Sequence, residues 1–93
     1  MIRSFKNSDS EKIFNREHSR AVPANLLEKA WVKLAMIHAA VRLEDLRVPP
    51  GNKLEKLSGD REGQFSIRIN QKYRICFYWQ DSNAFDVEVT DYH

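Results

Sequence analysis

Cysteine, clustered glycine and long apolar runs are all scarce in this sequence of 93 residues. The one cysteine, Cys76, excludes an internal disulfide framework and a thiolate zinc cluster. The sequence has neither a glycine-rich phosphate loop nor a Gly-x-Ser-x-Gly elbow, which removes the common nucleotide-binding and hydrolase classes. No apolar run reaches the ~18 residues of a membrane span, and residues 1–6 lack the apolar segment of a signal peptide. We therefore expect a cytoplasmic protein without a membrane partner.

Strong charge of one sign and metal-ligand spacing are lacking too. The formal net charge is only +2, so the protein is not a polycation that coats nucleic acid, and any nucleic-acid contact must be local. No His-x-x-x-His, Cys-x-x-Cys or acidic triplet is present, and we expect neither a metal nor another cofactor. A chain of this length has room for one core, and we assign residues 1–93 to a single domain.

The first half of the sequence has the patterns of helices. Residues 8–11 supply N-cap and acidic first-turn residues for a short helix through Phe14. After Pro23, apolar residues recur at steps of three and four and predict the main helix. Its apolar stripe consists of Leu27, Trp31, Leu34, Ile37 and Val41. We expect its other side to be solvated, with Glu28, Lys29, Lys33 and Arg42. Residues 1–6 alternate weakly, which predicts an edge strand, and Pro49-Pro50-Gly51-Asn52 ends the helical half.

The second half alternates apolar and polar residues with the period of strands. Three segments show the pattern, residues 65–70, 73–79 and 85–92. Hairpin connections separate them at residues 70–72 and 81–83, and residues 53–57 form a short strand or an extended loop. The order predicts an α+β fold in which two N-terminal helices pack on one face of a small, mainly antiparallel sheet.

Strand register predicts which residues share a face of this sheet. The core face takes Phe65, Ile67, Ile69, Tyr73, Ile75, Phe77, Trp79, Phe85, Val87 and Val89. The opposite face takes Arg68, Arg74, Tyr78, Glu88 and Tyr92. Two arginines and a tyrosine therefore meet on one surface, unless a bulge shifts one strand by a residue.

The two arginines have a structural and a functional interpretation. An arginine on an exposed strand face is commonly structural and pairs with a neighbour, here Glu88 or Asp86. The alternative is a phosphate clamp, because guanidinium presents planar, bidentate donors and keeps its charge. Arg61, in the glycine-bracketed turn at residues 59–63, adds a third cation. If the protein is an enzyme, the class that remains is a metal-free nuclease.

The last three residues, Asp91-Tyr92-His93, place a carboxylate, a phenol and an imidazole after the last strand. Tyr92 taken alone is typical of a half-buried strand cap. Imidazole titrates near neutrality, so His93 is able to move a proton during phosphodiester cleavage, although residues at chain ends are often frayed. His18 and His38 lie in the helical half, where a loop or hydrogen-bonded core histidine is the usual role.

Five segments together resemble the HigB toxins, in the HigB/GraT branch of the RelE/ParE superfamily. The segments are Pro49-Pro50-Gly51-Asn52, Gly59-Asp60-Arg61-x-Gly63-Gln64, Ser66-Ile67-Arg68-Ile69-Asn70, Tyr73-Arg74-Ile75-Cys76-Phe77 and Asp91-Tyr92-His93. The resemblance implies a RelE-like fold and a ribosome-dependent endoribonuclease that cuts messenger RNA in the decoding site. It also implies neutralisation by a HigA-type antitoxin with a helix-turn-helix domain. Operator DNA would be contacted only through the toxin–antitoxin complex.

The resemblance also distributes roles among the residues of the site. Phosphate stabilisation falls to Arg68 or Arg74, and Asp91, Tyr92 and His93 supply the C-terminal part. Several HigB toxins carry a histidine and a lysine before Gly-Asp-Arg, where this chain has Lys53-Leu54-Glu55-Lys56-Leu57-Ser58. Glu55 is then a candidate general base beside Tyr92, and Lys53, Lys56 and Arg61 are candidates for substrate binding.

Two other functions fit the same architecture. ParE-like toxins share it and are described as gyrase inhibitors, which bind a protein and do not cut RNA. The terminal Asp-Tyr-His argues against this alternative. A third possibility is an interaction module without enzymatic activity, whose alternating face binds only the antitoxin.

Overall fold

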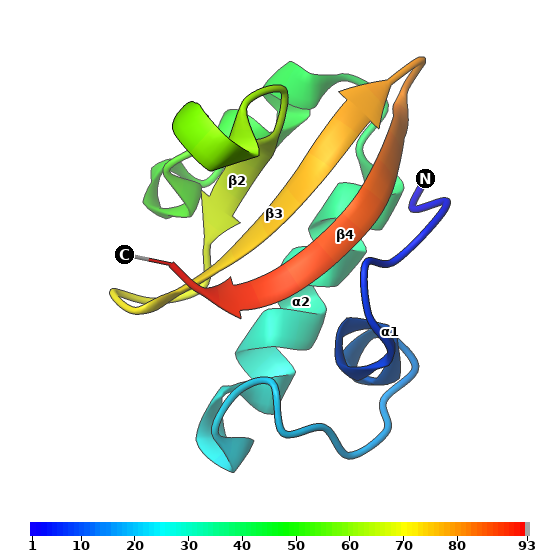
Figure 1. Ribbon diagram of the computed structural model, residues 1–93, viewed down its shortest axis with the longest axis vertical. Helices are drawn as coiled ribbons and strands as arrows, with labels where there is room; N and C mark the ends of the chain where they lie inside the picture. The colour runs from blue at the N-terminus through cyan, green and yellow to red at the C-terminus, as the bar shows by residue number, and fades with distance from the viewer. Residues whose placement is uncertain (93) are drawn as a thin grey trace.

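A computed structural model describes residues 1–92 as two α-helices packed on one face of a four-stranded antiparallel sheet (Figure 1). The helices are α1 (Ser8–Phe14) and α2 (Leu27–Ala39). The strands are β1 (Glu55–Lys56), β2 (Phe65–Arg68), β3 (Tyr73–Gln80) and β4 (Asn83–Asp91), in the order β1-β2-β3-β4. Four short 3-10 helices join them, η1 (Ala24–Leu26), η2 (Leu43–Arg47), η3 (Pro50–Asn52) and η4 (Gly59–Arg61). The predicted α+β architecture is confirmed.

Both predicted helices are present, with small differences at their ends. The side chain of Asn7 caps α1 by accepting a hydrogen bond from the Ser10 backbone N–H at 2.9 Å, one residue before the predicted start. Helix α2 ends at Ala39, and Val41, expected on its apolar stripe, is outside the helix and 67% exposed. The cause is Asp45, whose carboxylate accepts hydrogen bonds from the backbone N–H groups of Val41 and Arg42 at the start of η2. Neither helix of residues 1–92 is long and apolar enough to cross a membrane.

The core lies between the helices and the sheet. Its buried members come from both layers, and they are Ile13, Val22, Ala30, Leu34, Ile37, Ala40, Leu46, Ile67, Ile69, Ile75, Phe77, Ala84, Val87 and Val89. The predicted core face of β2 and β3 is therefore confirmed, with Phe65, Tyr73 and Trp79 partly buried against it. At about 25 cal/mol for each Å² of apolar surface removed from water, this layer supplies the main driving force of folding.

A β-bulge changes the register at the start of β4. Cys76 opposes Glu88, but Tyr78 opposes Phe85, so β4 holds one extra residue between these pairs. The extra residue is Asp86, with a φ of 51°. The prediction that Phe85 faces the core is therefore wrong. Ala84, which is fully buried, occupies the core position opposite Trp79.

The N-terminal segment covers the outer edge of β4. Ile2 and Phe5 form isolated parallel bridges with Ala84 and Val87, and in Figure 1 the segment runs beside this strand. Backbone hydrogen bonds of 2.8–3.0 Å, such as the one that the Arg3 N–H donates to the Ala84 carbonyl, hold the segment there. The predicted edge strand is therefore two bridges and not a continuous strand. The edge that would otherwise pair with another chain is covered.

Candidate active site

Two arginines face each other across β2 and β3. Arg68 and Arg74 are direct cross-strand partners, on the sheet face that points away from the helices. Like charges in this position destabilise a sheet. An anion bound to both guanidinium groups would replace this repulsion by attraction to each of them.

The two arginines differ in how they are held. Arg74 is only 6% exposed, its Nε donates to the Ser66 Oγ at 2.8 Å, and its Nη2 donates to the Lys53 carbonyl at 2.7 Å. Arg68 is half-buried, and its guanidinium has neither a hydrogen bond nor an ion pair within residues 1–92. Arg74 is thus a fixed cation, and Arg68 is available to a ligand.

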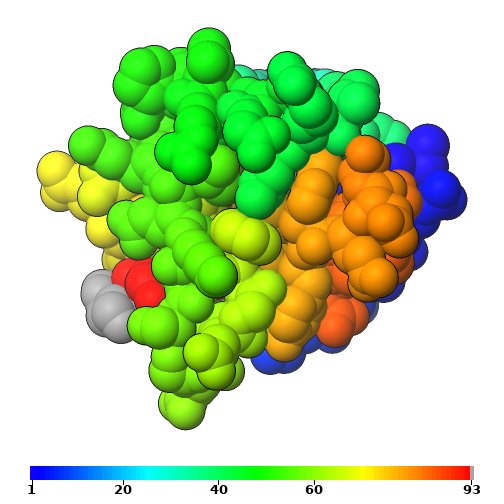
Figure 2. Space-filling model, turned by 90° about the horizontal axis from the view of Figure 1, so that it is seen from above, coloured from blue at the N-terminus to red at the C-terminus, as the bar shows by residue number. Residues whose placement is uncertain are grey.

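The predicted open face is covered over much of its area. In residues 53–64, β1 extends the sheet as its edge strand and η4 lies over the face, where Arg61 contacts Glu88, and Ser66 and Cys76 are fully buried. Burial raises the pKa of the Cys76 thiol, in keeping with its predicted role as a small filler. In Figure 2 this loop (green) lies in front of the sheet, and the last described residues (red) appear beside it.

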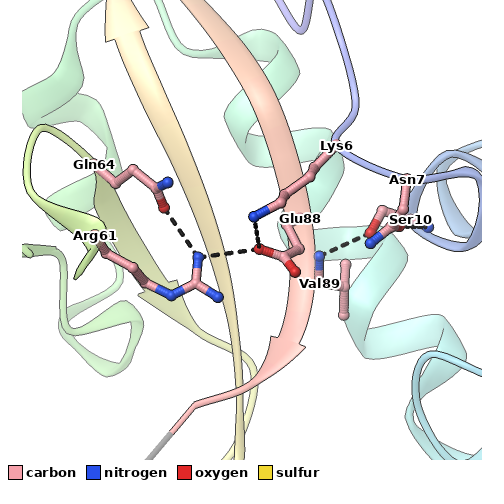
Figure 3. Close-up of polar contacts among 7 residues, drawn as sticks. All are labelled: Lys6, Asn7, Ser10, Arg61, Gln64, Glu88 and Val89. Atoms are coloured by element: carbon pink, nitrogen blue, oxygen red, sulfur yellow. Dashed lines mark hydrogen bonds and ion pairs between the residues drawn. The ribbon is translucent and has the colours of Figure 1, made fainter.

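Arg61 reaches from this loop to β4 (Figure 3). Its Nη1 donates to Glu88 Oε1 at 3.0 Å and to Gln64 Oε1 at 3.2 Å. Lys6 approaches the same Glu88 oxygen at 3.8 Å. Burial is the largest single influence on the pKa of Arg61 and acts to lower it, but the hydrogen bond to Glu88 and the electrostatic attraction of Cys76, Glu88 and Tyr92 together raise the pKa. Glu88 therefore pairs with Arg61 and Lys6 and not with Arg68 or Arg74, whereas Arg74 has structural partners of its own.

A pocket of about 330 Å³ opens beside Arg61. Its lining consists of Ser58, Asp60, Arg61, Asp91 and Tyr92. The Arg61 guanidinium carbon lies 6.0 Å from the centre of the Tyr92 ring, at the limit of a cation–π contact. An aromatic ring, a cation and carboxylates around one opening form a surface on which an unstacked nucleotide is able to bind.

Of the candidates before Gly-Asp-Arg, Glu55 and Lys53 lie at the arginine pair. Glu55 pairs with Ser66, on the arginine face, and its Oε1 lies 3.9 Å from Arg74 Nη2. Lys53 has a φ of 49°, and its backbone carbonyl is the group that contacts Arg74. Lys56 pairs with Phe65 and so falls on the helix side of the sheet, away from the two arginines.

Asp91 and Tyr92, two of the three C-terminal candidates, lie at the pocket. Tyr92 is half-buried, and its backbone N–H donates to the Lys72 carbonyl at 3.1 Å. The Asp91 carboxylate lies 3.5 Å from Lys72 Nζ, and Asp91 is opposite Tyr73 in the register. His93 lies outside the described residues, so its role stays a prediction. Among residues 1–92 no group of three His, Cys, Asp or Glu side chains is arranged to hold a metal ion.

His38 has the structural role expected of a core histidine. Its Nδ1 accepts a hydrogen bond from the Ile2 backbone N–H at 3.1 Å, and its ring lies 5.2 Å from that of Phe14. Sequence reasoning missed Ser66 and Gln64, which hold Arg74 and Arg61. For Ser66 a signal was present, because it is a polar residue between Phe65 and Ile67 in register with Arg68.

Comparison with solved structures identifies the class of fold. The chain matches a chain of a YoeB–YefM complex from Staphylococcus aureus with a TM-score of 0.62 and 21% identity, over 100% of this chain and 95% of that one. It matches a mutant of YafQ from E. coli with a TM-score of 0.59 and 15% identity, over 98% of this chain and 91% of that one. At these identities the similarity shows the fold alone, which is the RelE-like fold of these proteins.

Sequence comparison identifies the family within that class. A family model described as HigB-like toxin, a RelE-like toxin of type II toxin–antitoxin systems, matches residues 3–93. Toxin HigB-1 of Vibrio cholerae is 36% identical over 85 residues, 90% of each chain. Endoribonuclease HigB of Proteus vulgaris is 32% identical over 93 residues, the full length of both. The chain therefore belongs to the HigB-like toxins, which confirms the family that its sequence resembles.

Proposed function

We propose that the protein is the toxin of a type II toxin–antitoxin system and an endoribonuclease that cleaves messenger RNA on the ribosome. The observation that carries the proposal is the Arg68–Arg74 cross-strand pair, in which Arg74 is opposite Thr90, the residue before Asp91 of the pocket that Arg61 and Tyr92 also line. Such a pair is costly in a free protein and favourable when a phosphate lies between the guanidinium groups. The name of the Proteus vulgaris relative, Endoribonuclease HigB, supports the same activity.

The cleavage we propose uses the RNA's own 2′-hydroxyl group. Its oxygen attacks the adjacent phosphorus, the bond from phosphorus to O5′ breaks, and the products are a 2′,3′-cyclic phosphate and a 5′-hydroxyl. Glu55 or Tyr92 takes the 2′-hydroxyl proton, and His93 gives a proton to O5′. The arginines offset the charge that grows on the phosphorane oxygens. The proposed reaction uses no metal ion.

The ribosome supplies what this small protein lacks. A net charge of +2 gives little attraction for free RNA, and one 330 Å³ pocket holds little more than a nucleotide. A ribosome that already holds the message in position provides the remaining binding energy. Free RNA should therefore be a poor substrate, and the protein should act in the cytoplasm.

The partner we propose is an antitoxin. The matched YoeB structures are complexes with YefM, a toxin–antitoxin pair, which supports an antitoxin partner for this chain. By family we propose a HigA-type antitoxin with a helix-turn-helix domain. The complex of the two would contact operator DNA through the antitoxin. We propose residues 1–93 as one RelE-like toxin domain.

The test is to express the chain briefly in growing cells that lack the antitoxin and to map new 5′ ends in all transcripts. Cuts clustered in translated codons are expected for the wild type and for Arg20→Ala, an exposed arginine in the α1–α2 connection. They should be absent from Arg74→Ala and His93→Ala. Growth arrest without new 5′ ends would refute the nuclease and favour a gyrase inhibitor, and no arrest at all would favour a binding module.

A further inference from the structure

A lysine and an asparagine meet inside the protein behind the candidate active site. Lys33 of α2 is 8% exposed, although the sequence places it on the solvated side of the helix, and Asn52 at the end of η3 is fully buried. The Lys33 ammonium group donates to Asn52 Oδ1 at 2.5 Å. Asn52 Nδ2 donates in turn to the carbonyls of Leu46 and Val48, at 3.1 and 3.4 Å. The bonds join α2, η2 and η3 at one point.

This contact is held against an electrostatic cost. Burial, and secondarily the neighbouring charge of Lys29, lowers the pKa of Lys33. When both partners of a buried ionic contact are replaced by apolar residues of similar volume, the change is often neutral or stabilising, so stability alone is a weak reason for a buried lysine here. A better reason for a buried lysine is that it fixes the geometry of the residues around it.

The contact between Lys33 and Asn52 fixes the backbone geometry of Lys53. Lys53 follows Asn52 directly and has a φ of 49°, a conformation that few residues with a side chain adopt. Its carbonyl accepts the Arg74 Nη2 hydrogen bond at 2.7 Å. A short chain of contacts thus runs from Lys33 through Asn52 and the Lys53 carbonyl to Arg74.

We propose that Lys33 and Asn52 are positioning residues for Arg74 and set the direction in which its guanidinium meets the scissile phosphate. The inference rests on the proposed function, because it assumes that Arg74 contacts that phosphate. The Lys53 carbonyl fixes Nη2 and Ser66 Oγ fixes Nε, so within residues 1–92 the Nη1 group remains for substrate. Without the contact behind it, the left-handed turn at Lys53 relaxes and the guanidinium loses one of its two supports.

The experiment is a double-mutant cycle on cleavage of a short message bound to programmed ribosomes. Lys33→Met removes the donor at similar length, Lys33→Gln keeps an uncharged donor, and Lys29→Met is the matched control on the exposed side of α2. Each is made alone and with Arg74→Ala. The single-turnover rate at saturating toxin, the KM and the thermal unfolding midpoint are measured for all.

We expect Lys33→Met to cleave about 10- to 100-fold more slowly, with KM nearly unchanged, because a small misplacement of a catalytic group has effects of that order. Lys33→Gln should recover most of the rate, and Lys29→Met should equal the wild type. In the Arg74→Ala background Lys33→Met should cause no further loss. Should Lys33→Met not fold, it is replaced by Asn52→Asp, which keeps the acceptor for Lys33 but loses the bonds that Nδ2 donates to Leu46, Val48 and Met36, and the same loss of rate is expected.

Three outcomes separate this inference from the function on which it rests. A full rate in Arg74→Ala alone would overturn the role of Arg74 and with it the proposed site. A normal loss in Arg74→Ala, joined by an equal further loss from Lys33→Met in that background, would overturn only the positioning role. The positioning role would also be overturned if the cleavage rate of Lys33→Met fell only in proportion to its unfolding midpoint and Lys33→Gln lost the same rate. That result would show that the contact is purely structural.

Discussion

Replacing Arg68 with glutamine should stabilise the free protein and weaken catalysis at once. Arg68 and Arg74 are direct cross-strand partners, and like charges in that position cost roughly 0.2–1 kcal/mol. Arg74 cannot turn away, because two hydrogen bonds fix it, and Arg68 has no ionic partner within residues 1–92. Removing one charge relieves the repulsion, so the free energy of unfolding should rise by that amount at low salt.

The expected shift is large enough to measure. For a domain of this size 1 kcal/mol corresponds to roughly 4–8 °C in the unfolding midpoint, so Arg68→Gln should melt roughly 1–8 °C higher than the wild type. Phosphate should reverse the order, because an anion between the two arginines stabilises the wild type by about 2.7 kcal/mol at a hundredfold excess over its Kd. The variant, with one cation left, should gain less. Its cleavage rate should fall by about 10²- to 10³-fold.

The assay is thermal unfolding followed by circular dichroism, at low salt and over a phosphate titration, with Arg20→Gln as the control for loss of an exposed arginine. A lower midpoint in Arg68→Gln without phosphate would refute the claim that the pair repels. An equal response of wild type and Arg68→Gln to phosphate would refute the claim that the pair binds an anion.

Three further predictions concern other residues. Glu88→Gln should lower the free energy of unfolding by about 1–3 kcal/mol, measured by urea unfolding, because it weakens a charged hydrogen bond to an arginine that is three-quarters buried; an unchanged urea midpoint would contradict this. Hydrogen bonds from the backbone N–H groups of Arg42 and Val41 hold the pKa of Asp45 below its usual value. The stability that these hydrogen bonds contribute is therefore complete above the unfolded-state pKa of about 3.9 and is lost as pH falls through the lower pKa of the folded state. Asp45→Asn should accordingly reduce the thermal unfolding midpoint at pH 7 but not at pH 2. Cys76, buried with a raised pKa, should resist a thiol reagent at pH 8 until the protein unfolds, and rapid labelling of the native state would show that residues 53–64 do not cover it.

Local patterns were enough to predict the order of elements. Each pattern is local in the sequence: the apolar steps of three and four after Pro23 mark α2, and the alternation after residue 64 marks β2, β3 and β4. The break at Pro49-Pro50 separates the α-helices from the strands. The shared face of Arg68 and Arg74 followed from alternation alone, because both lie in strands without a bulge between them.

What could not be predicted depends on contacts between distant segments. Phe85 was placed on the wrong face because the bulge at Asp86 has no signal in the alternating pattern. Arg74 is buried, and not exposed, because residues 53–64 lie against it, and Lys33 is buried because η3 returns to α2. Helical spacing shows which side of a helix a residue occupies, but not which later segment covers that side.

The pairing of residues 1–6 with β4 has a consequence for the order of folding during synthesis. Residues 1–6 find their backbone partners at Ala84 and Val87, which are synthesised much later. Domains usually fold as units while the chain emerges, but contacts of such long sequence separation must wait. Ile2 and Phe5 stay unpaired until β4 exists, and β4 is also the strand that leads to Tyr92 at the pocket. A partly made chain of this toxin therefore has neither its last strand pairing nor its active site, and the two are completed together.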